Sequence, residues 1–109
     1  MTPRRDNVEY VVPSIIRQKF TESQYPNMIA NGELTPRYLR DKELKNPQQR
    51  RFPEPSGTKS QMIRYLDKDG RWCVEIHQYL RPDGTLGASG KQDPKRLKIG
   101  DKIYIAKDK

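Results

Sequence analysis

The chain contains little of what usually holds a small domain together. Of its 109 residues, one is Cys, one is His and one is Trp, and Leu, Ile, Val and Phe together make up 21. One cysteine cannot form an internal disulfide, which favours a reducing compartment. No apolar run approaches the length of a membrane-spanning helix, and the charged start TPRRDN lacks the hydrophobic region of a secretory signal. We therefore expect a cytoplasmic protein that does not enter a membrane.

What the chain has in excess is positive charge. Its formal net charge is +8, and residues 1–60 and 61–109 each hold 11 Lys and Arg against 7 Asp and Glu. Clustered cations release counterions from phosphates, so nucleic acid, either RNA or DNA, is an expected partner. The excess also fits a surface kept away from zero charge, or a basic subunit neutralised by an acidic protein. The mean hydropathy of −1.08 places the chain at the border between folded and partly disordered chains.

Changes in composition divide what we expect to be a single domain into four segments. Residues 1–12 are an extended, charged arm ending in VEYVV, a run that could add an edge strand to this protein's sheet or to a partner's. Residues 13–46 predict short helices, the clearest over 36–45, where a Thr-Pro pair is typical of a helix start. Residues 47–60, with three prolines, predict a linker. Residues 61–109 predict a β-meander.

The meander is expected to contain three strands, over residues 61–66, 71–81 and 102–106. Residues 82–98 between the last two predict a long Gly-rich loop, or a structured connection pinned by its leucines. The fold class predicted is α+β: a small antiparallel sheet of three or four strands, covered on one face by the short N-terminal helices.

Side chains on the central strand should alternate between two faces. Trp72, Val74, Ile76 and Leu80, interrupted by Gln78, predict the face that packs in the core. The opposite face would carry the following side chains: Arg71, Cys73, Glu75, His77, Tyr79 and Arg81. RNA cleavage needs a general base, a general acid and a cation, roles that Glu75, His77 and Arg81 could fill. The alternative is the mixed solvated face common in antiparallel sheets. Cys73 and His77 would be about 13 Å apart, too far to share a zinc ion, and no metal or cofactor is predicted.

Two further stretches predict contacts with phosphate. Arg50-Arg51-Phe52 places two cations beside an aromatic ring, so Phe52, like Tyr79, is a candidate for stacking on a base; alternatively Phe52 anchors the linker in the core. Glycines 84, 87 and 90 could turn backbone N–H groups toward a phosphate. Their spacing matches no known nucleotide loop. The candidate phosphate-binding residues are Arg50, Arg51, Lys91, Lys95, Arg96 and Lys98.

Residues 77–97, HQYLRPDGTLGASGKQDPKRL, resemble a motif of an uncharacterised family of small bacterial and phage proteins. In that family a Trp-containing strand leads into a similar loop and an Asp-Pro-Lys turn. The resemblance covers about residues 62–105 and none of the N-terminal half. It implies that the meander is a unit and carries no activity to transfer.

The sequence is consistent with three functions from different classes. The first is a non-enzymatic accessory protein that holds the nucleic-acid phosphate backbone through the six cations above, with little base readout. The second is a protein–protein interaction subunit of a larger bacterial or phage assembly, whose N-terminal arm orders on binding. The third is a metal-independent ribonuclease. The composition and motifs favour the first.

Overall fold

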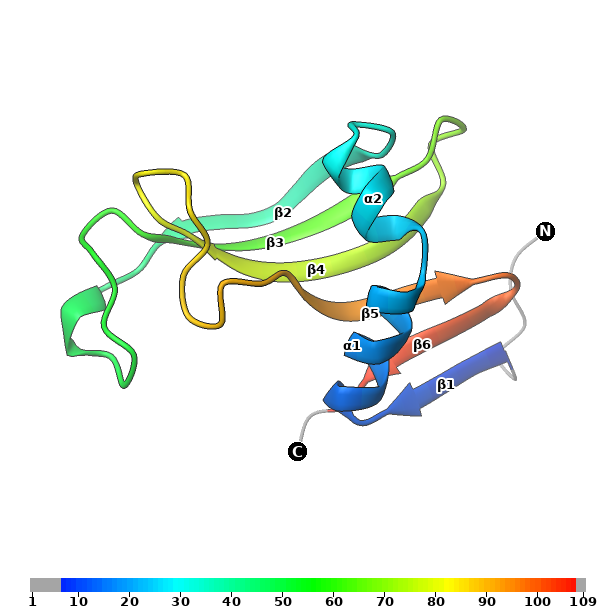
Figure 1. The fold of residues 1–109 in the computed structure, drawn as a ribbon, viewed down its shortest axis with the longest axis horizontal. Coiled ribbons are helices and arrows are strands. Elements are labelled where there is room, and N and C mark those ends of the chain that lie inside the picture. The colour runs from blue at the N-terminus through cyan, green and yellow to red at the C-terminus, as the bar shows by residue number, and fades with distance from the viewer. Residues whose placement is uncertain (1–6, 108–109) are drawn as a thin grey trace.

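The strands in the described part of the chain all join one sheet. The computed structural model describes residues 7–107, in which six strands lie in the order β1-β6-β5-β4-β3-β2 (Figure 1). The elements are β1 (Val8–Val11), α1 (Pro13–Glu22), α2 (Tyr25–Ala30), β2 (Thr35–Glu43), a short 3-10 helix (Pro47–Gln49), β3 (Lys59–Leu66), β4 (Trp72–Leu80), β5 (Asp93–Ile99) and β6 (Lys102–Ala106). Neighbouring strands are antiparallel except β1, which pairs with β6 in parallel.

The two helices lie on one face of this sheet (Figure 1). Pro13, which has no N–H to leave unsatisfied, starts α1, and the Ser23 hydroxyl caps its end by donating to the Phe20 carbonyl over 2.6 Å. Helix α1 buries Ile16 and Phe20. Helix α2 is fastened by the Tyr25 hydroxyl, which donates to the Lys98 carbonyl of β5 over 2.6 Å. Neither helix in residues 7–107 has the length and apolar character needed to cross a membrane.

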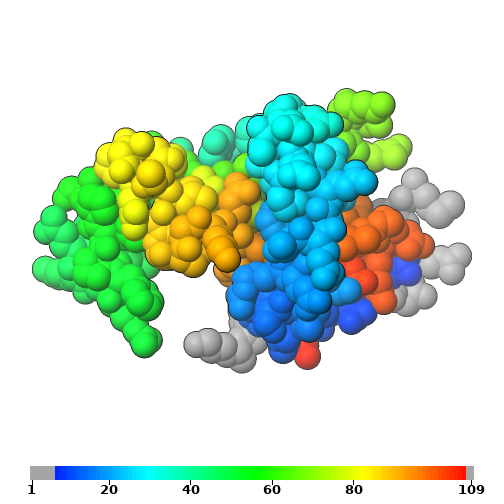
Figure 2. Space-filling view, viewed as in Figure 1, coloured from blue at the N-terminus to red at the C-terminus, as the bar shows by residue number. Residues whose placement is uncertain are grey.

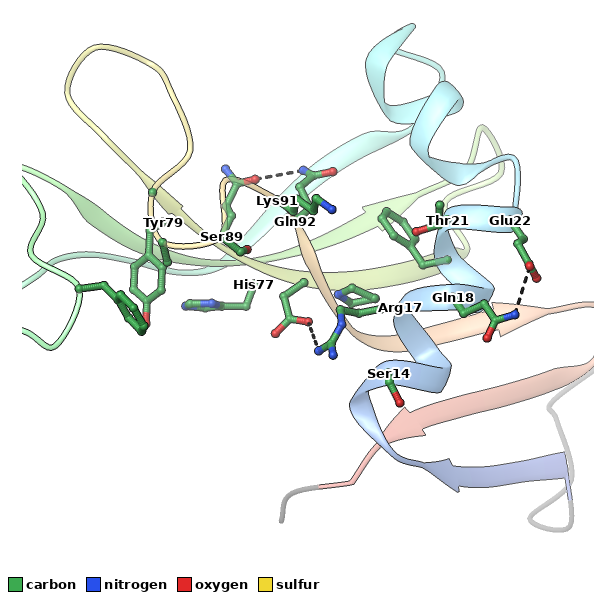
Figure 3. Close-up of a pocket in the computed structure, with 17 residues that line it drawn as sticks. Ser14, Arg17, Gln18, Thr21, Glu22, His77, Tyr79, Ser89, Lys91 and Gln92 are labelled. Atoms are coloured by element: carbon green, nitrogen blue, oxygen red, sulfur yellow. Dashed lines mark hydrogen bonds and ion pairs between the residues drawn. The ribbon is translucent and has the colours of Figure 1, made fainter.

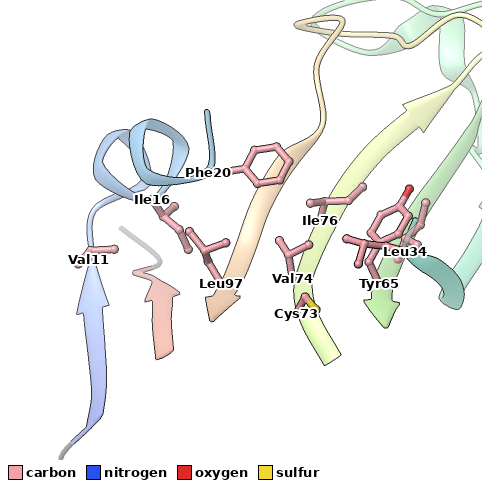
Figure 4. Packing of buried hydrophobic residues seen from close by; sticks show 10 residues of the cluster. Val11, Ile16, Phe20, Leu34, Tyr65, Cys73, Val74, Ile76 and Leu97 are labelled. Carbon is pink, nitrogen blue, oxygen red and sulfur yellow. The ribbon is translucent and has the colours of Figure 1, made fainter. Parts of the chain in front are cut away.

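The core lies between α1 and the middle of the sheet (Figure 4). Val74 of β4 pairs with Leu97 of β5, and Ile76 pairs with Pro94, so these side chains point together toward Ile16. Burying each large apolar side chain contributes about 1.5–3 kcal/mol. The predicted inward direction of Val74 and Ile76 is confirmed. Gln78, further along the same face, lies past the helices and is hydrogen-bonded to Gln61 and Gln92.

The predicted sheet of three or four antiparallel strands is wrong, although the α+β class holds. Two strands were not expected, and β1 makes the sheet mixed. The helix predicted over 36–45 is the edge strand β2, whose nine residues are all exposed. The Thr-Pro start suited a helix, but the segment has too few apolar side chains to dock as one, and pairing with β3 satisfies its backbone instead. An edge strand tolerates Pro36.

Strand β5 replaces the second half of the predicted 82–98 loop. In the sequence, Pro94 argues against a strand there, because proline cannot donate to a ladder. The register between β4 and β5 shifts at this point, from Glu75–Arg96 to Ile76–Pro94, so that Lys95 is an extra residue. This bulge accommodates the proline, whose side chain is fully buried.

A second bulge overturns the predicted position of Trp72. Tyr65 pairs with Val74 and Leu66 with Trp72, which leaves Cys73 as the extra residue of β4. Cys73 therefore joins Val74 in the core, and Trp72 turns to the face away from the helices. There the Lys98 ammonium lies 4.6 Å from the centre of its ring.

Other parts of the sequence prediction are confirmed. The expected strands at 61–66, 71–81 and 102–106 correspond to β3, β4 and β6. The VEYVV run does form an edge strand, and it pairs with the protein's own β6. The start of the predicted arm, residues 1–6, lies outside the described residues.

The bulge at Cys73 leads to a stability prediction. Ile76→Ala should lower the free energy of unfolding by about 2–5 kcal/mol because it empties a fully buried position. Trp72→Ala should cost less, despite removing a larger side chain, because the ring lies on the uncovered face. Urea unfolding followed by circular dichroism measures both, with the 40% exposed Ile99→Ala as control. A cost for Trp72→Ala equal to that for Ile76→Ala would contradict the assignment.

Candidate nucleic-acid interface

The face of the sheet opposite the helices carries side chains in register across every strand. Residues paired on neighbouring strands share a face, so one row can be followed from edge to edge. This row is Arg37, Arg64, Glu75, Arg96, Ile105 and Tyr10. We call the surface to which it belongs the open face.

Parallel rows add further cations to the open face. One row is Arg40, Met62, His77 and Asp93, and the next is Lys42, Ser60 and Tyr79. Lys98 lies on the same face beside Trp72. Among these residues six cations face two carboxylates: Arg37, Arg40, Lys42, Arg64, Arg96 and Lys98 against Glu75 and Asp93. The open face is therefore strongly positive.

Glu75 is the internal counter-ion of this surface. It is only 7% exposed, and one of its oxygens accepts from Arg64 over 2.9 Å. The Arg96 guanidinium lies 4.0 Å from its other oxygen. Both carboxylate oxygens thus face cations of the chain itself. Glu75 is held as a structural anion and does not have the setting of a general base.

His77 lies on the open face next to Tyr79. Its Nε2 is 2.8 Å from the Ser60 hydroxyl, and its ring meets that of Tyr79 edge to face, with centres 4.7 Å apart. Burial lowers the pKa of His77, as do Lys95, Arg40 and Arg50, while Asp93 opposes them. The imidazole is therefore neutral at pH 7.

Two arginines stack on two aromatic rings next to this histidine. Arg50 donates to the Tyr79 hydroxyl over 3.0 Å, and its guanidinium is 5.1 Å from the centre of that ring. The Arg51 guanidinium is 5.5 Å from the centre of the Phe52 ring. Phe52 is 66% exposed, so it does not anchor the linker in the core. Arginine–aromatic pairs of this kind bind both phosphates and base faces.

A groove opens beside these side chains because β4 and β5 stop pairing. Their pairing ends at His77 and Asp93, and β4 continues to Leu80 without β5 but still paired with β3. The groove has a volume of about 930 Å³ and lies between α1 and the 47–57 loop (Figure 2). Figure 3 shows His77 and Tyr79 on one side of it and Arg17 of α1 on the other. Lys91 and Phe52 also line it.

The Gly-rich loop binds an anion, and that anion is Glu54. This carboxylate is 4% exposed; it accepts from Arg81 Nε and from the Ala88 N–H, each over 2.7 Å. The Arg81 hydrogen bond and then the Ala88 N–H lower the pKa of Glu54. A Cβ at Gly87 would stand 2.7 Å from its oxygens, so only glycine allows this approach. The loop amide expected to face phosphate is therefore used within the chain.

The predicted site residues fall into separate groups. Arg50, Phe52 and Tyr79 are brought together, and Arg96 and Lys98 lie on the open face. Lys95 is paired with Asp93 over 2.8 Å. The three residues of the ribonuclease hypothesis are not assembled, because Arg81 is bound to Glu54 and Glu75 to Arg64.

Four cations of the open face do not belong to the predicted set of phosphate-binding residues: Arg37, Arg40, Lys42 and Arg64. Three of them lie on β2, which was expected to be a helix. The register shift between Tyr38 and Arg40 breaks the alternation that would have indicated a strand. The basic residues of this stretch are visible in the sequence, but a helix there would have faced them to solvent or to phosphate in another arrangement.

Cys73 lies in the hydrophobic core. Burial raises the pKa of the Cys73 thiol, which keeps it protonated. Among residues 7–107, no three His, Cys, Asp or Glu side chains gather as a set of metal ligands.

No protein-family model, curated protein or solved structure matches this chain. The resemblance of residues 62–105 to a family of small bacterial and phage proteins therefore stays a prediction.

The Glu54 contact predicts a strong dependence on residue 87. Gly87→Ala should lower the free energy of unfolding by about 1–3 kcal/mol, because the carboxylate is displaced from its partners. In a Glu54→Ala background the same substitution should cost close to nothing. A double-mutant cycle of urea unfolding measures this coupling. Equal costs in both backgrounds would show that Glu54 does not occupy the loop.

The lowered pKa of His77 predicts a pH dependence of stability. Below its usual value of 6.5, the unfolded chain binds a proton that the folded chain does not. The contribution of His77 is therefore full above about pH 6.5 and is lost as the pH falls toward its folded-state pKa. The difference in unfolding free energy between wild type and His77→Gln should shrink from about pH 7.5 to about pH 5.5. His77 is the only histidine, so its NMR titration is unambiguous, and a folded-state pKa of 6.5 or more would contradict the prediction.

Proposed function

We propose that this protein binds nucleic acid through the phosphate backbone, without catalysis, as an accessory protein of the cytoplasm. The observation that carries the proposal is the set of six cations in register on the open face. Cations on a sheet stand about 4.8 Å apart between strands and about 6.5–7 Å apart along a strand. Such an array contacts a chain of phosphates at several points and reads no bases.

The repulsion between the cations of this array lowers the stability of the sheet, which supports a functional role for them. Arg37 lies directly opposite Arg64, and like charges at opposed positions destabilise a sheet. Glu75 offsets part of the repulsion for Arg64 and Arg96, and nothing comparable pairs with Arg37 in these rows. Departures from local rules of this kind are expected at functional sites. Phosphates would supply the missing anions.

Neutralising one edge of the open face tests the proposal. The triple variant Arg37→Gln, Arg40→Gln and Lys42→Gln removes three exposed cations of β2. It should weaken binding to single-stranded or duplex oligonucleotides by at least about tenfold at low salt. It should also reduce the slope of log affinity against log salt by about two to three, because three fewer counterions are released. Fluorescence anisotropy at several salt concentrations measures both.

A matched control carries the same change in net charge elsewhere. The variant Lys45→Gln, Lys59→Gln and Lys68→Gln removes three exposed lysines outside the open face. It should keep most of the affinity. Equal losses in the two variants would mean that net charge alone attracts nucleic acid. Binding that ignores salt, or a discrete protein that co-purifies after nuclease treatment, would favour the protein–protein subunit instead.

A further inference from the structure

We infer that the groove takes an unstacked base of a single-stranded segment into the hollow shared by Phe52 and Tyr79. This inference rests on the proposed function and names its substrate class: single-stranded nucleic acid, in preference to a duplex. The juxtaposition that carries it is an exposed aromatic ring, a second ring and two arginines around one hollow at the end of the basic open face.

The hollow adjoins the main groove. It has a volume of about 370 Å³, and Phe52 and Tyr79 line both spaces. Its remaining walls are Arg50, Arg51, Glu54 and Ala88. Ligand pockets generally measure about 300–1,000 Å³ and combine apolar walls with a few polar groups. The hollow therefore has the size and the lining of a small ligand site.

Phe52 is placed for stacking by the loop that carries it. The 47–57 loop is closed by the Glu54 N–H, which donates to the Pro47 carbonyl over 3.0 Å, and by the buried Glu54 carboxylate. Between these fastened points the Phe52 ring stays 66% exposed. A single exposed aromatic is common on protein surfaces. An exposed aromatic on a fastened loop, under one guanidinium and facing a second arginine–aromatic pair, is a stacking platform.

The open face leads phosphates to this platform. Tyr79 is the last member of the row that contains Lys42 and Ser60. A nucleic-acid strand whose phosphates contact the cations of the open face therefore reaches the hollow beside Tyr79. A base meets an aromatic face only when it leaves its own stack. A duplex keeps its base faces covered, so it can occupy the open face and cannot fill the hollow. The site therefore selects single strands.

Three fluorescein-labelled probes separate stacking from charge. They are an oligothymidylate of about 12 nucleotides, an abasic oligomer with the same number of phosphates, and the oligothymidylate annealed to oligoadenylate. With the full-length wild-type protein at one salt concentration, the oligothymidylate should bind about tenfold more tightly than the abasic oligomer. It should also bind more tightly than the duplex.

Variants test whether the Phe52 ring causes the preference for oligothymidylate over the abasic oligomer. Phe52→Ala should bind the oligothymidylate and the abasic oligomer alike, and Phe52→Trp should restore the preference. Tyr38→Ala, which removes a 54% exposed ring outside the groove, should leave the preference unchanged. Circular dichroism confirms that each variant is folded.

The outcomes distinguish this inference from the proposed function. Salt-dependent binding with equal affinity for oligothymidylate and abasic oligomer, or a preference that survives Phe52→Ala, overturns the inference and leaves backbone binding intact. A wild-type protein that binds none of the three probes at low salt overturns both.

Discussion

The short pairing between β4 and β5 is the constraint on which the rest of the structure depends. Four residue pairs, from Val74–Leu97 to His77–Asp93, join the β2–β4 half of the sheet to the β5, β6 and β1 half. Helix α1 covers this junction because the paired side chains Val74, Ile76, Leu97 and Pro94 give it an apolar surface. The bulge at Lys95 accommodates Pro94, and no pairing between the two strands extends past His77. Beyond this point β4 continues to Leu80 paired with β3, and the Gly87 N–H of the Gly-rich loop donates to the Tyr79 carbonyl on its other edge. The groove opens where β5 leaves β4.

Two buried carboxylates decide which cations remain available. Glu54 binds Arg81 and the Ala88 N–H, and so fixes both the Gly-rich loop and the 47–57 loop. Glu75 sits between Arg64 and Arg96 and allows a row of cations to cross the middle of the sheet. Removing either acid would leave a partly buried arginine without its hydrogen-bond acceptor, which destabilises the fold. Each acid therefore positions positive charge. Glu54 binds Arg81 and removes it from the set of unpaired cations. Glu75 binds between Arg64 and Arg96, while Arg37, Arg40 and Lys42 at the edge of the open face stay exposed. The proposed nucleic-acid binding follows from this division of charge.

The sequence was a better guide to side-chain chemistry at the ends of strands than to the strands themselves. Arg50 and Phe52 are predicted because an aromatic ring beside arginines is recognisable in the sequence, and His77 and Tyr79 because they alternate along a predicted strand. Arg37, Arg40 and Lys42 are visible as a basic cluster, but the sequence assigns them to a helix, because Thr35-Pro36 is a good helix start and the irregularity at Leu39 hides the strand period. The glycine spacing around Gly87 predicts a loop that could bind phosphate. Its actual ligand, Glu54, stands far back in the sequence, and nothing between the two residues indicates that they meet.

The sequence by itself determined the features that depend on neighbouring residues. These are the presence of a short helix just after β1, the turns at Gly70 and Gly100, the inward direction of Val74 and Ile76, and the positive charge of the whole chain. Only the tertiary structure decided where alternation fails, which strands lie at the edges and which acid meets which arginine. Turn chemistry and side-chain alternation arise from covalent geometry within a few residues. The bulges at Cys73 and Lys95, by contrast, come from the registers of two neighbouring strands at once, and ion pairs such as Arg81–Glu54 join residues that only folding brings together.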